Sequence, residues 1–113
     1  VFRASKFPRI IKTFGDSMMP LLHNGDVVYI RKINFHKIKI NDIVCISKRG
    51  KIFTHRVVFI SKSYLVTKGD NSFKSDNKIY SKNVTGIVYK IKSSNFKFYI
   101  ITIMSLKFIS WEI

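Results

Sequence analysis

The segment 15–20, which reads Gly-Asp-Ser-Met-Met-Pro, contains the first side chain that could do covalent chemistry. Ser17 lies between a flexible glycine and a turn that Pro20 stiffens, so its hydroxyl can be exposed with backbone N–H groups beside it. A serine nucleophile in acyl transfer needs both the exposure and the donors. The same residues could also form an ordinary surface turn, so further groups must decide between the two interpretations.

Groups that could assist such a serine occur in two later segments. Residues 53–58 read Phe-Thr-His-Arg-Val-Val, and residues 67–72 read Thr-Lys-Gly-Asp-Asn-Ser, with a further aspartate at Asp76. An imidazole is largely neutral at pH 7, so His55 can accept the proton of a serine hydroxyl. A histidine base also benefits from a carboxylate that fixes its tautomer, which Asp70 or Asp76 could supply.

Together the three segments resemble the signature motifs of type I signal peptidases. Ser-Met-x-Pro at 17–20, followed by Gly-Asp at 25–26, resembles the first motif, and the Gly-Asp-Ser-Met version is similar to that of the related LexA-like self-cleaving repressors. His-Arg-Val-Val at 55–58 resembles the second motif in the histidine-type enzymes of archaea and the endoplasmic reticulum. Lys-Gly-Asp-Asn at 68–71 resembles the third. The order and spacing of the segments favour this family over coincidence, and the resemblance covers residues 14–91.

The resemblance implies a serine endopeptidase that removes signal or leader peptides from precursor proteins through an acyl-enzyme. Ser17 is then the nucleophile and His55 its base. Asp76 is our first choice for the acid that orients the histidine, while Asp70, also in the catalytic group, is expected to hold the loop. The implied substrate is an extended peptide with small side chains before the cut, bound as an added strand beside Ser17.

The family also implies membrane association, with the active site on the extracytoplasmic face. The formal charge of +15, from 21 basic and 6 acidic residues, suits an anionic membrane surface as a partner beside the precursor protein. Signal peptidases usually carry a transmembrane helix before the nucleophile, whereas residues 1–16 are basic, broken by Pro8 and unable to span a bilayer. We expect either an anchor outside this sequence or a peripheral contact, to which the apolar segment 96–111 would contribute.

One position departs from the family pattern. Signal peptidases often carry, two residues before the nucleophile, a serine whose hydroxyl helps to bind the oxyanion, and this chain has Gly15 there. The oxyanion hole would then depend on the backbone N–H of Ser17. Losing one donor typically costs about 10²–10³ in rate, so we expect a weaker oxyanion hole with the same mechanism.

Two alternatives to a signal peptidase stay open. The first is also proteolytic: a dedicated maturation peptidase for one partner protein, or a self-processing LexA-like module. The second is a non-catalytic basic module that binds anionic lipid or nucleic acid through interleaved lysines and aromatics, as in residues 95–99. No known nucleic-acid motif is present, so nucleic acid is not an expected partner. No cofactor or metal ion is expected either, because His23 and His36, which we expect at the surface, show no metal-ligand spacing.

The elements that must position these side chains are predicted to be strands. A chain of 113 residues predicts one peptidase domain, 1–113, with its core at about 14–91. Apolar runs separated by Gly, Asn and Asp predict a mostly β fold, a small domain of coiled antiparallel sheets. The runs are 26–31, 42–47, 51–60, 64–67 and 84–91. Residues 47–51 predict a hairpin connection, residues 18–23 a short turn, and Cys45 a small core residue.

Overall fold

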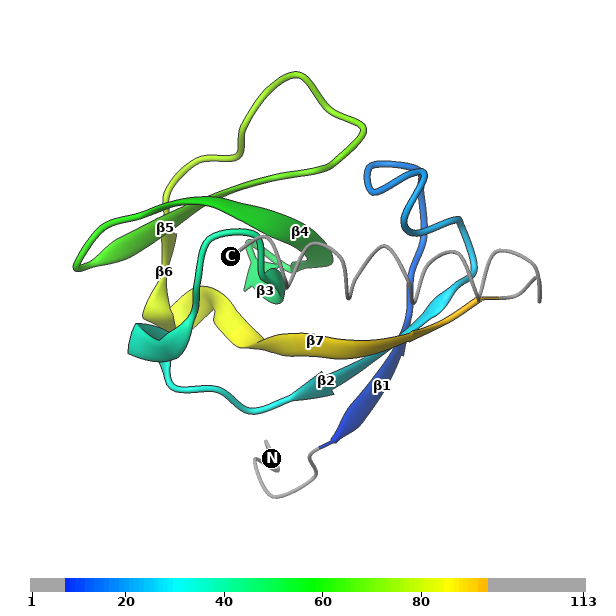
Figure 1. Cartoon of the computed structure of the whole chain (residues 1–113), viewed down its shortest axis with the longest axis horizontal. Coiled ribbons are helices and arrows are strands. Elements are labelled where there is room, and N and C mark those ends of the chain that lie inside the picture. The colour runs from blue at the N-terminus through cyan, green and yellow to red at the C-terminus, as the bar shows by residue number, and fades with distance from the viewer. Residues whose placement is uncertain (1–7, 94–113) are drawn as a thin grey trace.

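The computed structural model describes residues 8–93. Within them, seven strands form one antiparallel sheet in the order β1-β2-β7-β3-β4-β5-β6 (Figure 1). The mostly β, antiparallel fold that the sequence predicts is confirmed. The strands are β1 (Arg9–Lys12), β2 (Val27–Arg31), β3 (Ile43–Lys48), β4 (Lys51–Ile60), β5 (Tyr64–Lys68), β6 (Ile79–Tyr80) and β7 (Val84–Lys92), with the 3-10 helices η1 (Phe35–Lys37) and η2 (Ser81–Asn83) between them.

The five predicted strands are all present, with ends that shift by at most one residue. The two strands that the sequence did not predict, β1 and β6, are four and two residues long, too short to show a clear alternation. The turn expected near residues 18–23 forms, with the N–H of Leu22 donating to the carbonyl of Met18 at 2.9 Å. The apolar segment 96–111 lies outside the described residues.

The hairpin predicted at residues 47–51 forms between β3 and β4, and its connection has two residues. Lys48 pairs with Lys51, and the two residues between them, Arg49 and Gly50, have φ angles of 52° and 76°. Positive φ at both central positions is the backbone of a tight turn that matches the twist of the flanking strands. The hairpin therefore sets the register of β4, which carries His55.

Strand β3 is buried on both faces and joins two separate groups of core side chains. Ile43 and Cys45 pack with Met18, Leu22 and residues of β2 and β7, whereas Val44 and Ile46 pack with residues of β4, β5 and β6. Figure 1 shows why: the coiled sheet places β4 and β5 on one side of β3 and β2 and β7 on the other. A one-residue slip of β3 would exchange the two sets, so its register is strongly specified.

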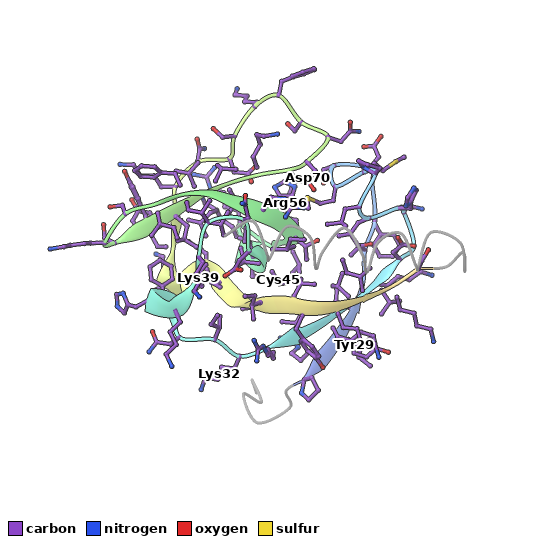
Figure 2. All side chains as sticks on the ribbon, viewed as in Figure 1. Tyr29, Lys32, Lys39, Cys45, Arg56 and Asp70 are labelled. Atoms are coloured by element: carbon purple, nitrogen blue, oxygen red, sulfur yellow. The ribbon has the colours of Figure 1, made fainter. Side chains whose placement is uncertain are left out.

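Cys45 is fully buried, as predicted for a small core residue, and burial raises the pKa of its thiol. Figure 2 shows Cys45 inside the fold, Arg56 and Asp70 beside the upper loops, and Lys32 at the far side of the molecule. Among residues 8–93, no helix has the length and apolar character needed to cross a membrane.

Candidate active site

The turn that carries Ser17 is fixed to the strands on either side of it. The N–H and the hydroxyl of Thr13 both donate to the carbonyl of Asp26, at 2.7 and 2.8 Å, and so join the end of β1 to the start of β2. The buried carboxylate of Asp26 accepts the N–H of His23 at 2.8 Å. Because Met18 beside the serine is also buried in the core, Ser17 has little freedom to move.

Gly15 has a structural role in the same turn. Its φ is +87°, a conformation that glycine adopts without strain, and its N–H donates to the side-chain oxygen of Asn24 at 2.8 Å. The N–H of Ser17 makes no hydrogen bond to any of residues 8–93. That N–H is therefore the backbone donor beside the hydroxyl that is free to bind a substrate oxygen.

His55 lies on β4, where it pairs with Val44 of β3. Its Nε2 is 3.1 Å from the hydroxyl oxygen of Ser17, and its ring centroid is 4.8 Å from that of Phe53, two residues earlier on the same face. The His55 side chain is 13% exposed. The register of β4 thus places the imidazole on the face that meets the serine.

Asp76 lies on the other side of the imidazole, in the loop between β5 and β6. Its Oδ2 is 2.6 Å from Nδ1 of His55 and also accepts the hydroxyl of Thr67 at 2.7 Å. The N–H of Asp76 donates to the carbonyl of Thr67 at 2.7 Å, so two bonds to one fully buried residue hold the carboxylate. With Asp76 accepting at Nδ1, the imidazole carries its proton there and presents a lone pair at Nε2 to Ser17.

The loop after β5 closes over the nucleophile turn. Asn71 donates its N–H to the carbonyl of Ser17 at 2.8 Å and its side-chain amide to the carbonyl of Asp16 at 3.2 Å. Gly69 lies so close to Ser17 that a Cβ added to it would be 2.6 Å from the Ser17 carbonyl oxygen. The approach of this loop therefore requires glycine at position 69.

Asp70 faces Arg56 and not His55. Both carboxylate oxygens accept from the guanidinium, Oδ1 from Nε at 2.8 Å and Oδ2 from Nη2 at 2.7 Å, while Nη1 donates to the carbonyl of Asn41 at 3.0 Å. Planar two-point pairing of this kind fixes direction as well as distance. Asp70 thus ties the loop 69–72 to β4 beside the histidine.

The other two histidines lie away from this line of bonds. His36 is exposed in η1, as expected. The expectation that His23 lies at the surface is wrong: its side chain is 23% exposed, with Nδ1 3.7 Å from the carboxylate of Asp26. The reason is that residues 21–22 are buried leucines, so the turn folds inward and takes His23 with it.

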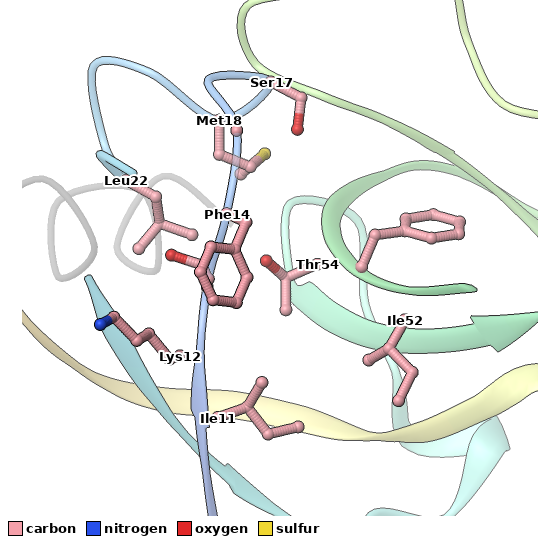
Figure 3. A pocket seen from close by; sticks show the side chains of 11 residues that line it. Ile11, Lys12, Phe14, Ser17, Met18, Leu22, Ile52 and Thr54 are labelled. Atoms are coloured by element: carbon pink, nitrogen blue, oxygen red, sulfur yellow. The ribbon is translucent and has the colours of Figure 1, made fainter. Parts of the chain in front are cut away.

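A small apolar pocket opens beside Ser17 (Figure 3). In Figure 3 Ser17 and Met18 stand at one end of the pocket and Ile11 and Ile52 at the other, with Phe14 and Thr54 between them. Its volume is about 90 Å³, the space of about three water molecules. A pocket of this size and lining can receive small apolar groups close to the serine hydroxyl.

Two residues that contact the site were not assigned roles from the sequence. Thr67 and Asn71 lie within the third recognised segment, yet their types alone fit a strand and a turn. Their roles follow from which atoms they reach, the carboxylate of Asp76 and the carbonyl of Ser17. Nothing in the sequence signals that Thr67 contacts Asp76, nine residues later.

Comparison with known proteins places the chain beside one kind of enzyme subunit. The scan against protein-family models finds no match. The signal peptidase complex catalytic subunit SEC11 of Colletotrichum graminicola is 33% identical over 88 residues, which are 72% of this chain and 51% of that protein. The SEC11 subunit of Debaryomyces hansenii is 32% identical over 80 residues, 65% of this chain and 47% of that protein. The chain thus spans about half the length of these curated relatives.

Proposed function

Because this chain belongs to the type I signal peptidase family, we propose that it is a serine endopeptidase that cleaves signal or leader peptides from precursor proteins. One observation supports this proposal above the others. The hydroxyl of Ser17, the two ring nitrogens of His55 and the carboxylate of Asp76 form one continuous line of hydrogen-bond contacts. A nucleophile, a base and an orienting acid in that order are the arrangement that serine enzymes with a histidine base use for acyl transfer at neutral pH.

In the proposed mechanism, Ser17 Oγ attacks the scissile carbonyl while Nε2 of His55 takes the hydroxyl proton. The imidazolium then gives this proton to the departing amine, which leaves an ester on Ser17. Water attacks the ester with His55 again as base, and the serine is restored. Asp76 stabilises the imidazolium through Nδ1, and its two hydrogen bonds with Thr67, one accepted by the carboxylate and one donated by its own N–H, keep it in place.

The oxyanion that forms during attack would be bound by the N–H of Ser17. Gly15 has no side-chain donor to add, and its own N–H is used by Asn24. We therefore propose a hole with one donor fewer than in enzymes that carry a serine at that position. A missing donor typically costs about 10²–10³ in rate, so the enzyme is expected to be slow without any change in mechanism.

The substrate is proposed to bind as an extended strand between two free sheet edges. Strand β1 ends the sheet, and β5 pairs with β4 only from Arg56 to Ile60, which leaves residues 51–55 without a partner on that side. Residues of both edges line the apolar pocket beside Ser17. A substrate strand there can form backbone hydrogen bonds while a small side chain enters the pocket.

The setting proposed for this activity is an anionic membrane surface, with the active site on the extracytoplasmic face. The net charge of +15 supports the anionic surface, since each basic residue close to such a surface contributes about 1 kcal/mol. Co-sedimentation with vesicles that contain anionic lipid, compared with vesicles of neutral lipid, tests this part. Equal binding to the two kinds of vesicle would contradict it.

Cleavage of a secretory precursor tests the peptidase activity. We expect the variants Ser17→Ala and His55→Ala each to lose about 10⁶-fold in kcat, the effect of removing one member of such a set. Ser63→Ala and His36→Ala are matched controls, because both residues are exposed and neither takes part in the contacts of the site. The proposal fails if Ser17→Ala and His55→Ala still cleave at the wild-type rate.

A further inference from the structure

A second cleft lies beside the catalytic aspartate, and four of its nine lining residues are cations. Its volume is about 350 Å³, and Phe53 belongs both to this cleft and to the small apolar pocket beside Ser17. The two spaces therefore meet next to His55, whose ring contacts Phe53. The side chains of the cleft that matter here are Lys48, Arg49, Lys51, Lys74, Phe53 and Asp76.

The four cations of the cleft have no anionic partner within the described part of the chain. None of them forms an ion pair with any of residues 8–93, and Lys48 donates only to a backbone carbonyl, that of Lys78, at 3.0 Å. The one carboxylate in the lining, Asp76, is already held by His55 and Thr67. Like charges gathered around one space repel each other, and an anionic group placed among them relieves that repulsion.

The free edge of β4 runs between the basic cleft and the apolar pocket. Successive side chains of a strand point to opposite faces, and here Ile52 and Thr54 line the apolar pocket, Lys51 lines the basic cleft, and Phe53, on the same face as Lys51, borders both. A peptide added to this edge would continue the sheet, so its own side chains would also alternate between the two faces. Every second substrate residue would then face the apolar pocket, and the residues between them would face the cations.

We propose that the cleft around Lys51 and Lys74 is a specificity subsite that selects substrates with an acidic side chain on the strand face opposite the small residues. The proposal rests on the proposed peptidase activity and adds a substrate class to it, namely peptides in which acidic residues alternate with small apolar ones near the cut. Lys51 and Lys74 are exposed, so each ion pair with a substrate carboxylate is expected to contribute modestly.

Pairs of peptides that differ only by Glu or Gln at one position test the subsite. Glu or Gln is placed at successive positions on either side of the cleaved bond, and kcat/KM is measured for each pair with the full 113-residue chain. We expect Glu to be preferred by about five-fold at alternate positions and not at the positions between them. The preference should shrink in 1 M salt, which screens exposed charges.

Variants separate this local effect from the overall positive charge. Lys51→Gln/Lys74→Gln should lose the Glu-over-Gln ratio, whereas Lys32→Gln/Lys37→Gln, which removes the same charge from a separate pocket that does not include the cleft residues, should keep it. The proposal is overturned if the two double variants lower the ratio equally or if Glu is favoured at every position alike.

Binding of the same peptides to the Ser17→Ala variant tests the subsite without catalysis. Tighter binding of the Glu peptides at alternate positions supports the subsite, provided that the triple variant with Lys51→Gln and Lys74→Gln loses this preference. This result supports the subsite even if the wild-type enzyme cleaves no peptide. In that case only the peptidase proposal fails. Cleavage that depends on Ser17 with no Glu preference in either assay rejects the subsite and leaves the peptidase activity standing.

Discussion

Replacing Gly69 by alanine should impair catalysis by direct contact with the nucleophile turn. The added Cβ would lie 2.6 Å from the carbonyl oxygen of Ser17 and 3.2 Å from Nε2 of His55, whereas real Cβ contacts are essentially never under 3.0 Å and become ordinary at 3.4 Å. The loop or the turn must therefore move by about 0.4 to 0.8 Å. Neither can move freely, because Asn71 binds the Ser17 carbonyl and Arg56 holds Asp70.

The expected loss follows from that displacement. A misplacement of about 1 Å costs about 100-fold in rate, so Gly69→Ala should lower kcat by about 10- to 100-fold. Overpacking should also lower the free energy of unfolding by about 1–3 kcal/mol. Both are measured on the same preparation, as kcat on a saturating precursor and as a thermal midpoint.

Gly50→Ala is the matched control for this experiment. Gly50 has a φ of +76° and no atom within 4 Å of an added Cβ, so alanine there costs about 1–2 kcal/mol of backbone strain and touches nothing at the site. We expect Gly50→Ala to lose stability and keep kcat. A Gly69→Ala enzyme with wild-type kcat would refute the reasoning, because the loop would then be free to withdraw without displacing Ser17.

Three other changes have definite expected outcomes. Asp76→Asn removes the charge that stabilises the imidazolium and should lower kcat by about 10⁴-fold in steady-state kinetics. Thr67→Val, which removes one bond to that carboxylate, should lower kcat by about 10-fold, and a wild-type kcat in Thr67→Val would mean that this bond does not contribute. Arg56→Leu and Asp70→Asn should each lower the free energy of unfolding by about 2 kcal/mol in denaturant titrations. The double variant should lose less than the sum of the two, whereas additive losses would mean that the pair contributes nothing. Burial raises the pKa of the Cys45 thiol, so the free energy of unfolding should fall as pH rises above about 8.5, where the thiol of the unfolded chain ionises first. Cys45→Ala should remove that part of the fall. The same pH profile in Cys45→Ala and in the wild type would contradict this role of the thiol.

Much of the fold follows from local sequence signals. The apolar runs and the connection at residues 47–51 were enough to predict the central strands and the β3–β4 hairpin, because both signals are carried by neighbouring residues. Strands β1 and β6 were not predicted because they are short edges that form only when β2 and β5 are there to pair with them. Their formation depends on contacts far along the chain.

The candidate site divides in the same way. Ser17, His55 and Asp76 could be named from recognisable segments, and the structure brings their side chains together. The sequence could not decide which of Arg56 and His55 each aspartate faces, since Asp70 and Asp76 are the same residue type in one loop and the direction of their side chains depends on the folded loop. The pairing of Asp70 with Arg56 depends on the register between β4 and that loop, a tertiary property.

Acid quenching of a reaction in progress tests the nucleophile most directly. A precursor is mixed with the enzyme, the reaction is stopped at low pH within one turnover, and the digested enzyme is examined by mass spectrometry for a covalent acyl adduct. We expect an adduct, with the mass of the amino-terminal cleavage fragment less one water, on the peptide that contains Ser17, and none in Ser17→Ala or His55→Ala. Cleavage that continues in Ser17→Ala, or an adduct on any other residue, would contradict the assignment.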